Sequence, residues 1–181
     1  MRRKSLVGPL LALASVGGVI AFAVWLWWNL FRPLPSDASL SSRFHAHRSD
    51  FDSLATMALA DTQLVGAGHD WMLMRFTVFV HDNARFNRML TDGEVRATGR
   101  AGLRRLIDRA GVPSISRGAD AVWFVVMSNH GRARKGLVYS ERAPGPLRPS
   151  LDGLERTKAG YVMPGYVPLA PRWFLFLEPA D

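Results

Sequence analysis

Hydrophobic and polar residues are unevenly distributed along the chain, and the first long pattern is an apolar run. Between Lys4 and Arg32, 27 residues carry no charge. As a helix rising about 1.5 Å per residue they would reach roughly 40 Å, more than the ~30 Å hydrocarbon core of a bilayer. The pattern predicts an N-terminal transmembrane helix over residues 5–31, behind a short basic cytoplasmic tail, residues 1–4. The run exceeds a signal-peptide core and lacks an A-x-A-like cleavage site, which indicates an uncleaved signal anchor.

Aromatic and basic residues at the end of this run indicate where the membrane would stop. Amphipathic indole rings favour the headgroup level, so the predicted membrane-interface residues are Trp25, Trp27, Trp28 and Arg32. Positive charges at residues 2–4 favour a cytoplasmic N-terminus and an extracytoplasmic domain, periplasmic in a cell with two membranes. Small residues spaced four apart, such as Ala14 and Gly18, permit close helix pairing and leave a homodimer open.

The remainder predicts a short linker and one domain. Residues 32–41 are rich in proline and serine, and residues 42–181 form the predicted extracytoplasmic domain. Apolar residues recur at helical spacing from about 42 to 60, after a cap at Ser41 or Ser42. A second helix is predicted from a cap at Thr98 to Gly111, with leucines on one side and arginines on the other.

Alternating and continuous apolar runs predict the strands. They lie at residues 71–80, 121–127, 137–141 and 172–178, with a possible short strand at 64–65 and a hairpin turn at 128–136. The segments 81–97 and 161–168 are interpreted as turns and extended loop. The prediction is an α+β fold: an N-terminal transmembrane helix, then one small domain of about two helices and a largely antiparallel sheet of about four strands.

Composition narrows the chemistry. The chain has no cysteine, which excludes disulfides, thiolate catalysis and cysteine-ligated metals. The formal charge of +8 is a mild bias toward anionic partners. Because aromatic and basic residues do not alternate and the domain is tethered, nucleic acid is not an expected partner.

Several short motifs resemble those of small uncharacterised bacterial proteins that are membrane-anchored or lipid-anchored. The matching residues are Phe44, Arg48, Phe51, Leu54, Met57, Asp61, Lys135, Gly136, Tyr139, Pro144, Pro146, Leu147, Ser150, Leu151, Asp152, Tyr166, Trp173, Phe174 and Leu175. The resemblance implies an α+β domain behind an anchor. It implies no activity.

No catalytic motif is present, and we expect no cofactor and no metal. An envelope hydrolase remains an alternative if acidic and histidine side chains converge in the fold. The residues concerned are His69, Asp70, Asp120, His130 and Asp152.

Basic residues cluster on the second predicted helix and in the hairpin turn. They are Arg100, Arg104, Arg105, Arg109, Arg132, Arg134 and Lys135. This pattern favours either a solvated helix face or a site for anionic lipid or glycan. The leading hypothesis is a single-pass, membrane-anchored binding or accessory module that presents its domain to another protein at the cell envelope; an enzyme is less favoured.

Overall fold

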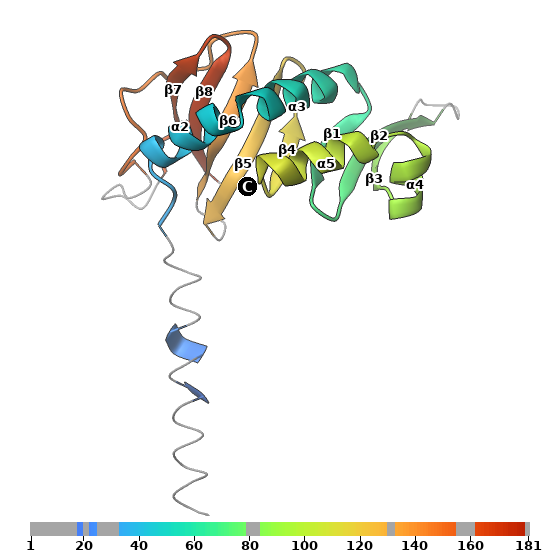
Figure 1. The fold of residues 1–181 in the computed structure, drawn as a ribbon, viewed down its shortest axis with the longest axis horizontal. Coiled ribbons are helices and arrows are strands. Elements are labelled where there is room, and N and C mark those ends of the chain that lie inside the picture. The colour runs from blue at the N-terminus through green and yellow to red at the C-terminus, as the bar shows by residue number, and fades with distance from the viewer. Residues whose placement is uncertain are drawn as a thin grey trace, which may run out of the picture. The chain divides into compact units, whose positions relative to one another are not determined.

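A computed structural model of the protein describes residues 18–19, 22–24, 33–78, 84–129, 133–154 and 162–179. The chain divides into two compact units, Met1–Pro33 and Leu34–Asp181. Residues 18–19 and 22–24 of the first unit are helical. The second unit is the folded domain and is described by itself (Figure 1).

One antiparallel sheet of eight strands forms the domain's framework. The strand order is β3-β2-β1-β4-β5-β6-β8-β7. The strands are β1 (Leu64–Gly68), β2 (Met72–Val78), β3 (Ala84–Met89), β4 (Ser114–Arg117), β5 (Ala121–Asn129), β6 (Ala133–Ser140), β7 (Gly165–Ala170) and β8 (Trp173–Pro179). Edge strand β7 contains Pro168, a residue that edges tolerate because it donates no ladder hydrogen bond.

The described part of the domain has four helices. They are α2 (Asp37–Ala46), α3 (Arg48–Ala60), α4 (Asp92–Ala97) and α5 (Ala101–Ala110). The Ser36 side chain caps α2, and Thr91 with Glu94 forms a capping box on α4. Gly111 ends α5 in the left-handed conformation that glycine adopts without strain.

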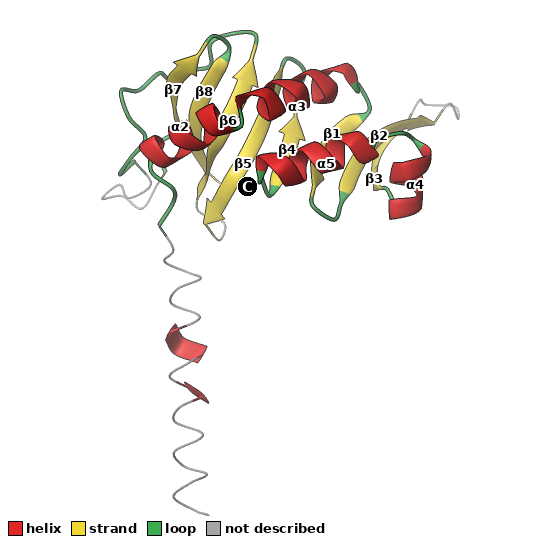
Figure 2. Cartoon of the chain, in the orientation of Figure 1, coloured by secondary structure: helices red, strands yellow, loops and turns green. Residues whose placement is uncertain are grey.

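Helices α2, α3 and α5 lie on one face of the sheet, and the main core lies between them and the strands (Figure 2). Four rings meet at its centre: Phe44 of α2, Phe51 of α3, Phe124 of β5 and Trp173 of β8. Centroids of the Trp173 ring and the other three lie 5.1–6.0 Å apart, with tilted and edge-on geometries. This cluster joins both helices to the middle of the sheet.

Gly136 of β6 allows a close approach between two central strands. A Cβ atom at this position would overlap the carbonyl oxygen of Phe124 on β5. The register between β5 and β6 shifts beside it, between Val125 and Met127. Such a bulge bends the strand and brings the two backbones together, so a glycine is required here for packing.

The predicted strand and helix content is wrong, although the sheet is antiparallel as expected. The sheet has eight strands and not about four. The unpredicted β3, β4 and β7 are short, and their sequences are polar or contain glycine and proline. The predicted helix 42–60 is two helices, because His47 leaves helical geometry with φ −121° and ψ 25°. The first of these begins at Asp37, inside the predicted linker.

The N-terminal part of the predicted fold also needs correction. Among the described residues, no helix is long and apolar enough to cross a membrane. Most of the predicted span 5–31 lies outside the described residues, as do Trp25, Trp27, Trp28, Arg32 and the tail 1–4. A transmembrane helix is therefore not part of the fold that the structure describes.

Candidate functional site

A groove runs along the outer side of α3, where this helix packs beside α5. It consists of two adjoining hollows of about 400 and 430 Å³. The first is lined by Met57, Ala60, Asp61, Gly99, Arg100 and Leu103, and the second by Asp52, Ser53, Thr56 and Met57. Met57 belongs to both, and 38% of its surface is exposed. We call this feature the α3 groove.

Small residues keep the α3 groove open. Gly102 of α5 faces Met57, and a Cβ atom at Gly102 would lie 3.6 Å from the Met57 Cε atom. The lining runs from residue 52 to residue 61, about 14 Å at helical rise. A methionine side chain is flexible and polarisable and adapts to different apolar partners. The floor of the groove can therefore receive an apolar side chain of another molecule.

Charged pairs lie at both ends of the α3 groove. At one end Arg100 donates hydrogen bonds of 2.6 and 3.2 Å to the Asp61 carboxylate. At the other end Asp52 accepts bonds from Arg48 Nε at 3.1 Å and from Trp173 Nε1 at 2.9 Å. Burial opposes the charge of Asp61, but Arg100 together with backbone hydrogen bonds from Gln63 and Leu64 outweighs it and lowers the pKa of this carboxyl. The groove is thus apolar in the middle and charged, but locally neutralised, at its ends.

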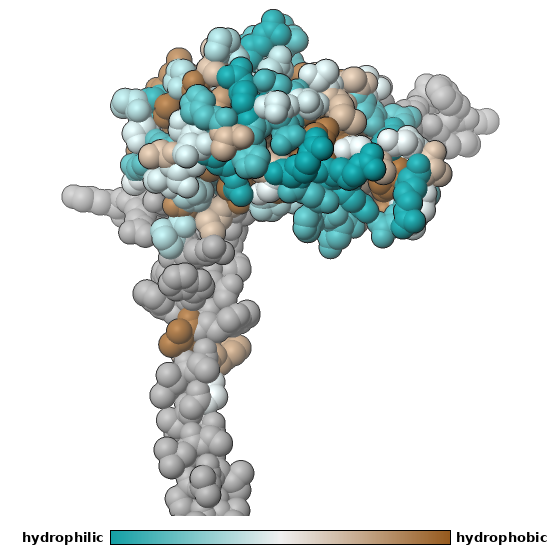
Figure 3. Space-filling model, viewed as in Figure 1, coloured by the Kyte–Doolittle hydropathy of each residue, from teal (hydrophilic) through white to brown (hydrophobic). Residues whose placement is uncertain are grey.

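Most of the basic residues predicted for the second helix form ion pairs with carboxylates. Besides Arg100, Arg104 pairs with Asp92 at 2.5 Å and Arg109 with Asp50 at 3.1 Å. Arg105 is exposed and has no partner among the described residues. The outer side of α5 is strongly hydrophilic (Figure 3). These arginines therefore offer little unneutralised charge to an anionic lipid or glycan.

The other predicted basic residues do not form a turn. Arg134 and Lys135 lie on β6, while Arg132 is outside the described residues. Arg134 donates bonds of 2.9 and 3.2 Å to Glu178 on the neighbouring β8. Lys135 points to the opposite face of the sheet and is only 1% exposed. The two residues therefore have different surroundings and belong to no common site.

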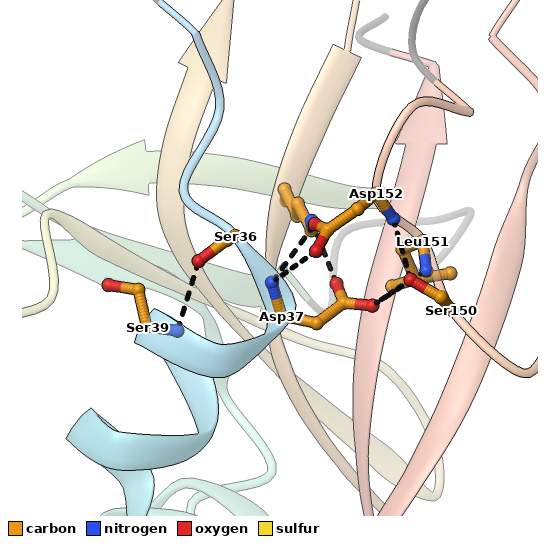
Figure 4. A network of polar contacts seen from close by, with 7 residues as sticks. Ser36, Asp37, Ser39, Ser150, Leu151 and Asp152 are labelled. Atoms are coloured by element: carbon orange, nitrogen blue, oxygen red, sulfur yellow. Dashed lines mark hydrogen bonds and ion pairs between the residues drawn. The ribbon is translucent and has the colours of Figure 1, made fainter.

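Lys135 lies between two carboxylates at the start of the domain. Its Nζ donates a hydrogen bond of 2.7 Å to Asp152 Oδ1 and forms an ion pair of 2.8 Å with Asp37 Oδ1. The backbone N–H of Asp37, at the first residue of α2, donates to the Asp152 carboxylate at 3.0 Å. In return the Asp37 carboxylate accepts 2.7 and 2.8 Å bonds from Leu151 N and Ser150 Oγ (Figure 4). We call these five residues the clasp.

The clasp joins three segments that are distant in the sequence: α2, β6 and the loop after β6. Burial opposes the charge of Asp37, but Lys135 and the hydrogen bonds from Leu151 and Ser150 hold the pKa of its carboxyl below the usual value. Each group in the clasp thus has a partner, as a buried charge requires. The Lys135 ammonium is almost fully buried and held by two carboxylates, so the arrangement suits structural fixation.

The residues named for a hydrolase do not come together in the described structure. His69 Nδ1 contacts Asp108 Oδ1 at 2.5 Å beside a hollow of about 360 Å³, but 75% of its side chain is exposed. Asp120 lies 4.0 Å from Arg142, and Asp152 belongs to the clasp. Among the described residues, no hydrogen bond or ion pair joins any two of His69, Asp70, Asp120 and Asp152. His130 lies outside the described residues.

Metal ligands are not gathered in the part of the chain that the structure describes. No group of three histidine, aspartate or glutamate side chains lies close enough there to hold an ion. We therefore assign no metal ion to the α3 groove or to the clasp.

Sequence reasoning missed Asp37, Asp52 and Asp108 as partners in these arrangements. One signal was available for the clasp: positions 133, 135, 137 and 139 of β6 alternate toward the core, and a lysine occupies one of them. An inward lysine requires a carboxylate, although the pattern does not identify which one. The α3 groove has no comparable signal, because it depends on the packing of two helices.

Comparison of the chain with known protein families, curated proteins and solved structures finds no match. The resemblance to anchored bacterial proteins therefore stays a prediction. Its motif residues nevertheless meet in two places: Lys135, Ser150, Leu151 and Asp152 in the clasp, and Phe44, Phe51 and Trp173 in the core cluster.

Proposed function

We propose that this protein is a membrane-anchored binding or accessory module that presents its α+β domain to another protein at the cell envelope. The α3 groove is the observation that carries the proposal. The apolar N-terminal sequence supports attachment to the membrane, and the basic residues 2–4 support an extracytoplasmic domain.

The shape and chemistry of the α3 groove suit a protein segment. A central exposed methionine provides an adaptable apolar contact, while the flanking Asp52–Arg48 and Asp61–Arg100 pairs provide a polar rim. This division into apolar centre and polar rim is typical of protein interfaces. An amphipathic helix with one apolar side chain over Met57 would fit, with anchors at helical spacing.

The two alternatives have weaker support. The hydrolase alternative lacks a convergent cluster in the described residues. The anionic alternative depends on arginines that, among the described residues and apart from Arg105, already pair with carboxylates. Neither alternative uses an open apolar surface.

Site-specific photo-crosslinking in intact cells tests the proposal. A photoreactive phenylalanine analogue replaces Met57, and in a matched control it replaces Met163, which is 43% exposed and lies outside the α3 groove. We expect the Met57 position to capture one protein species that the control position does not capture. Equal capture at both positions, or none at Met57, would contradict the proposal.

A charge substitution provides the second test. Met57→Asp places a carboxylate in the apolar centre of the α3 groove without disturbing the core, because Met57 is partly exposed. We expect crosslinking from a neighbouring probe at Ser53 to fall at least tenfold, whereas Met163→Asp leaves it unchanged. Carbonate extraction of the same membranes tests the anchor: protein released into the soluble fraction would overturn that part of the proposal.

A further inference from the structure

The two outer strands of the sheet, β7 and β3, lie at its opposite ends (Figure 1) and differ in how their free edges are covered. Residues 146–148 lie along β7: the Tyr166 N–H donates to the Pro146 carbonyl at 3.0 Å, and the Tyr166 carbonyl accepts from Arg148 N at 2.8 Å. Pro168 removes a further donor from this strand. An edge strand otherwise offers unpaired N–H and C=O groups to another chain, so the β7 edge is protected against such pairing.

The edge of β3 has no comparable cover. No strand among the described residues lies on its outer side. Its pairing with β2 runs from Ala84 to Met89 without a register shift, so no bulge twists the edge away, and the strand contains no proline. Asn87, Arg88 and Met89 are exposed, Met89 to 61%. The β3 edge is therefore regular and accessible to a further strand.

The hydrogen bonds between β2 and β3 show which backbone groups of β3 point outward. The Leu90 N–H donates to the Met72 carbonyl at 2.9 Å, in the register of the strand pair. Along an antiparallel strand, successive residues direct their N–H and C=O groups alternately to one neighbour and to the other. Residues 86, 88 and 90 therefore face β2, and the backbone groups of Arg85, Asn87 and Met89 face outward.

We infer that β3 pairs with β3 of a second copy of this protein, antiparallel and across a two-fold axis at Asn87. In this register Asn87 lies opposite the partner's Asn87, and Arg85 lies opposite the partner's Met89. Each of these pairs exchanges two main-chain hydrogen bonds. The contact is isologous, since both copies use the same residues. The two sheets then continue into one another.

The sequence of β3 favours this register over its neighbours. Like charges directly opposite one another destabilise a sheet. With the axis at Asn87, no arginine lies opposite an arginine, because Arg88 lies opposite the partner's Phe86. An axis at Arg88 would oppose two arginines, and an axis at residue 86 would leave Met89 without a counterpart in residues 84–89. The strand is thus complementary to itself.

Pairing of one short strand buries little surface, so it requires a high local concentration of the second copy. Attachment of both copies to one membrane would supply it, and in this respect the inference rests on the proposed function. The two can fail separately. Carbonate extraction tests the anchor, and Met57→Asp, which disrupts the α3 groove, is expected to leave β3 pairing unchanged.

Disulfide capture in intact membranes tests the inference, because the chain has no cysteine of its own. Asn87→Cys places a thiol at the two-fold axis, where the Cα atoms of a hydrogen-bonded pair lie about 5.5 Å apart, a separation that a disulfide spans. Met89→Cys is the matched control: this position is more exposed, but its two copies would lie roughly 14 Å apart. After oxidation of full-length protein with copper phenanthroline, we expect at least about tenfold more disulfide-linked dimer from Asn87→Cys.

A proline substitution tests whether the main chain carries the contact. Met89→Pro removes an outward N–H and leaves the bonds to β2 in place, whereas Met89→Ala keeps that N–H. In the Asn87→Cys protein, we expect Met89→Pro to abolish the dimer and Met89→Ala to retain it, with circular dichroism reporting whether each variant is folded. The comparison of the two cysteine positions needs no proline variant.

Three results would overturn the inference. They are equal dimer yields from Asn87→Cys and Met89→Cys, as random collision or pairing of the N-terminal segments alone would give; no dimer from Asn87→Cys; and capture of a different protein at position 87. A folded Met89→Pro variant that still forms the dimer would also contradict it.

Discussion

The clasp and the ion pairs of α5 use the same kinds of charged group in different surroundings. In the clasp, Lys135 is 1% exposed and has two carboxylate partners. On α5, Arg109 is 64% exposed and pairs with a single carboxylate of Asp50. Water therefore solvates the Arg109–Asp50 pair, whereas the Lys135 ammonium has almost no contact with water.

The difference shows that burial, and not the number of ion pairs, decides what a charged residue contributes here. An exposed pair gains little because water competes for both charges and salt screens them. A buried charge that loses its partner retains its full desolvation cost. The clasp should therefore be sensitive to substitution, and the α5 pairs should be tolerant.

Removing the buried ammonium should have the largest effect. Lys135→Met keeps the length of the side chain but leaves Asp37 and Asp152 without their cation, so we expect the free energy of unfolding to fall by about 3–5 kcal/mol. Chemical denaturation monitored by circular dichroism measures this change. A loss below about 1 kcal/mol would show that the clasp is no more important than a surface pair.

Acid should destabilise the folded protein by a smaller amount than the Lys135→Met substitution does. The folded-state pKa values of Asp37 and Asp61 are lowered, because in each case a neighbouring cation and several hydrogen bonds together outweigh the opposing effect of burial. Their stabilisation is therefore complete above the unfolded pKa of about 4 and is lost as the pH falls through the lower folded values. We expect the denaturation midpoint to be level from pH 7 to pH 5 and to decrease below pH 4.

Asp37→Asn is the matched variant for the acid experiment. It removes one of the four described carboxyls whose pKa is lowered in the folded state, so the decrease below pH 4 should be shallower than in the unaltered protein. An identical decrease in both proteins would assign the acid sensitivity to other groups.

Breaking the half-buried pair at the α3 groove should have an intermediate effect. Asp61→Asn keeps the shape of the side chain but weakens the bonds from Arg100, and we expect a loss of about 1 kcal/mol. A double-mutant cycle with Arg100→Met isolates the interaction between the two residues. A coupling energy near zero would indicate that this end of the α3 groove is not fixed by the pair.

The exposed pair should be the least sensitive. Arg109→Met retains the apolar stem and removes only the charge, so we expect a change below about 0.5 kcal/mol that disappears in high salt. The same denaturation series with and without added salt measures it. A change comparable with that of Lys135→Met would remove the contrast between the two regions.

Much of the central architecture could be predicted from the sequence. Helix α5 follows its apolar periodicity to Gly111, and β5 and β8 follow continuous apolar runs. The pattern failed for β4, which has four residues, and for β7, where proline and glycine indicate a loop. These two strands are stabilised by backbone pairing with their neighbours in the sheet. This is a long-range effect that the local sequence propensity does not report.

The candidate sites were less predictable for a related reason. Residues 36 and 37 lie in a stretch that proline and serine mark as linker, yet Ser36 caps α2 and Asp37 enters the clasp. The α3 groove brings together residues near 57 and 102 through helix packing. The arginines of α5 were predicted as a cluster, but their carboxylate partners come from α3, α4 and the turn after α3.

The exchange of hydrogen bonds between Asp37 and the 150–152 loop has a consequence for any force or truncation applied at the N-terminal side. Tension transmitted along the chain from residue 33 would reach these bonds before it reached the aromatic core. A shortened protein that begins after residue 37 would lack the Asp37 carboxylate, so it would expose the Lys135 ammonium to water and lose the first turn of α2. Recombinant soluble fragments should therefore start at or before Leu34.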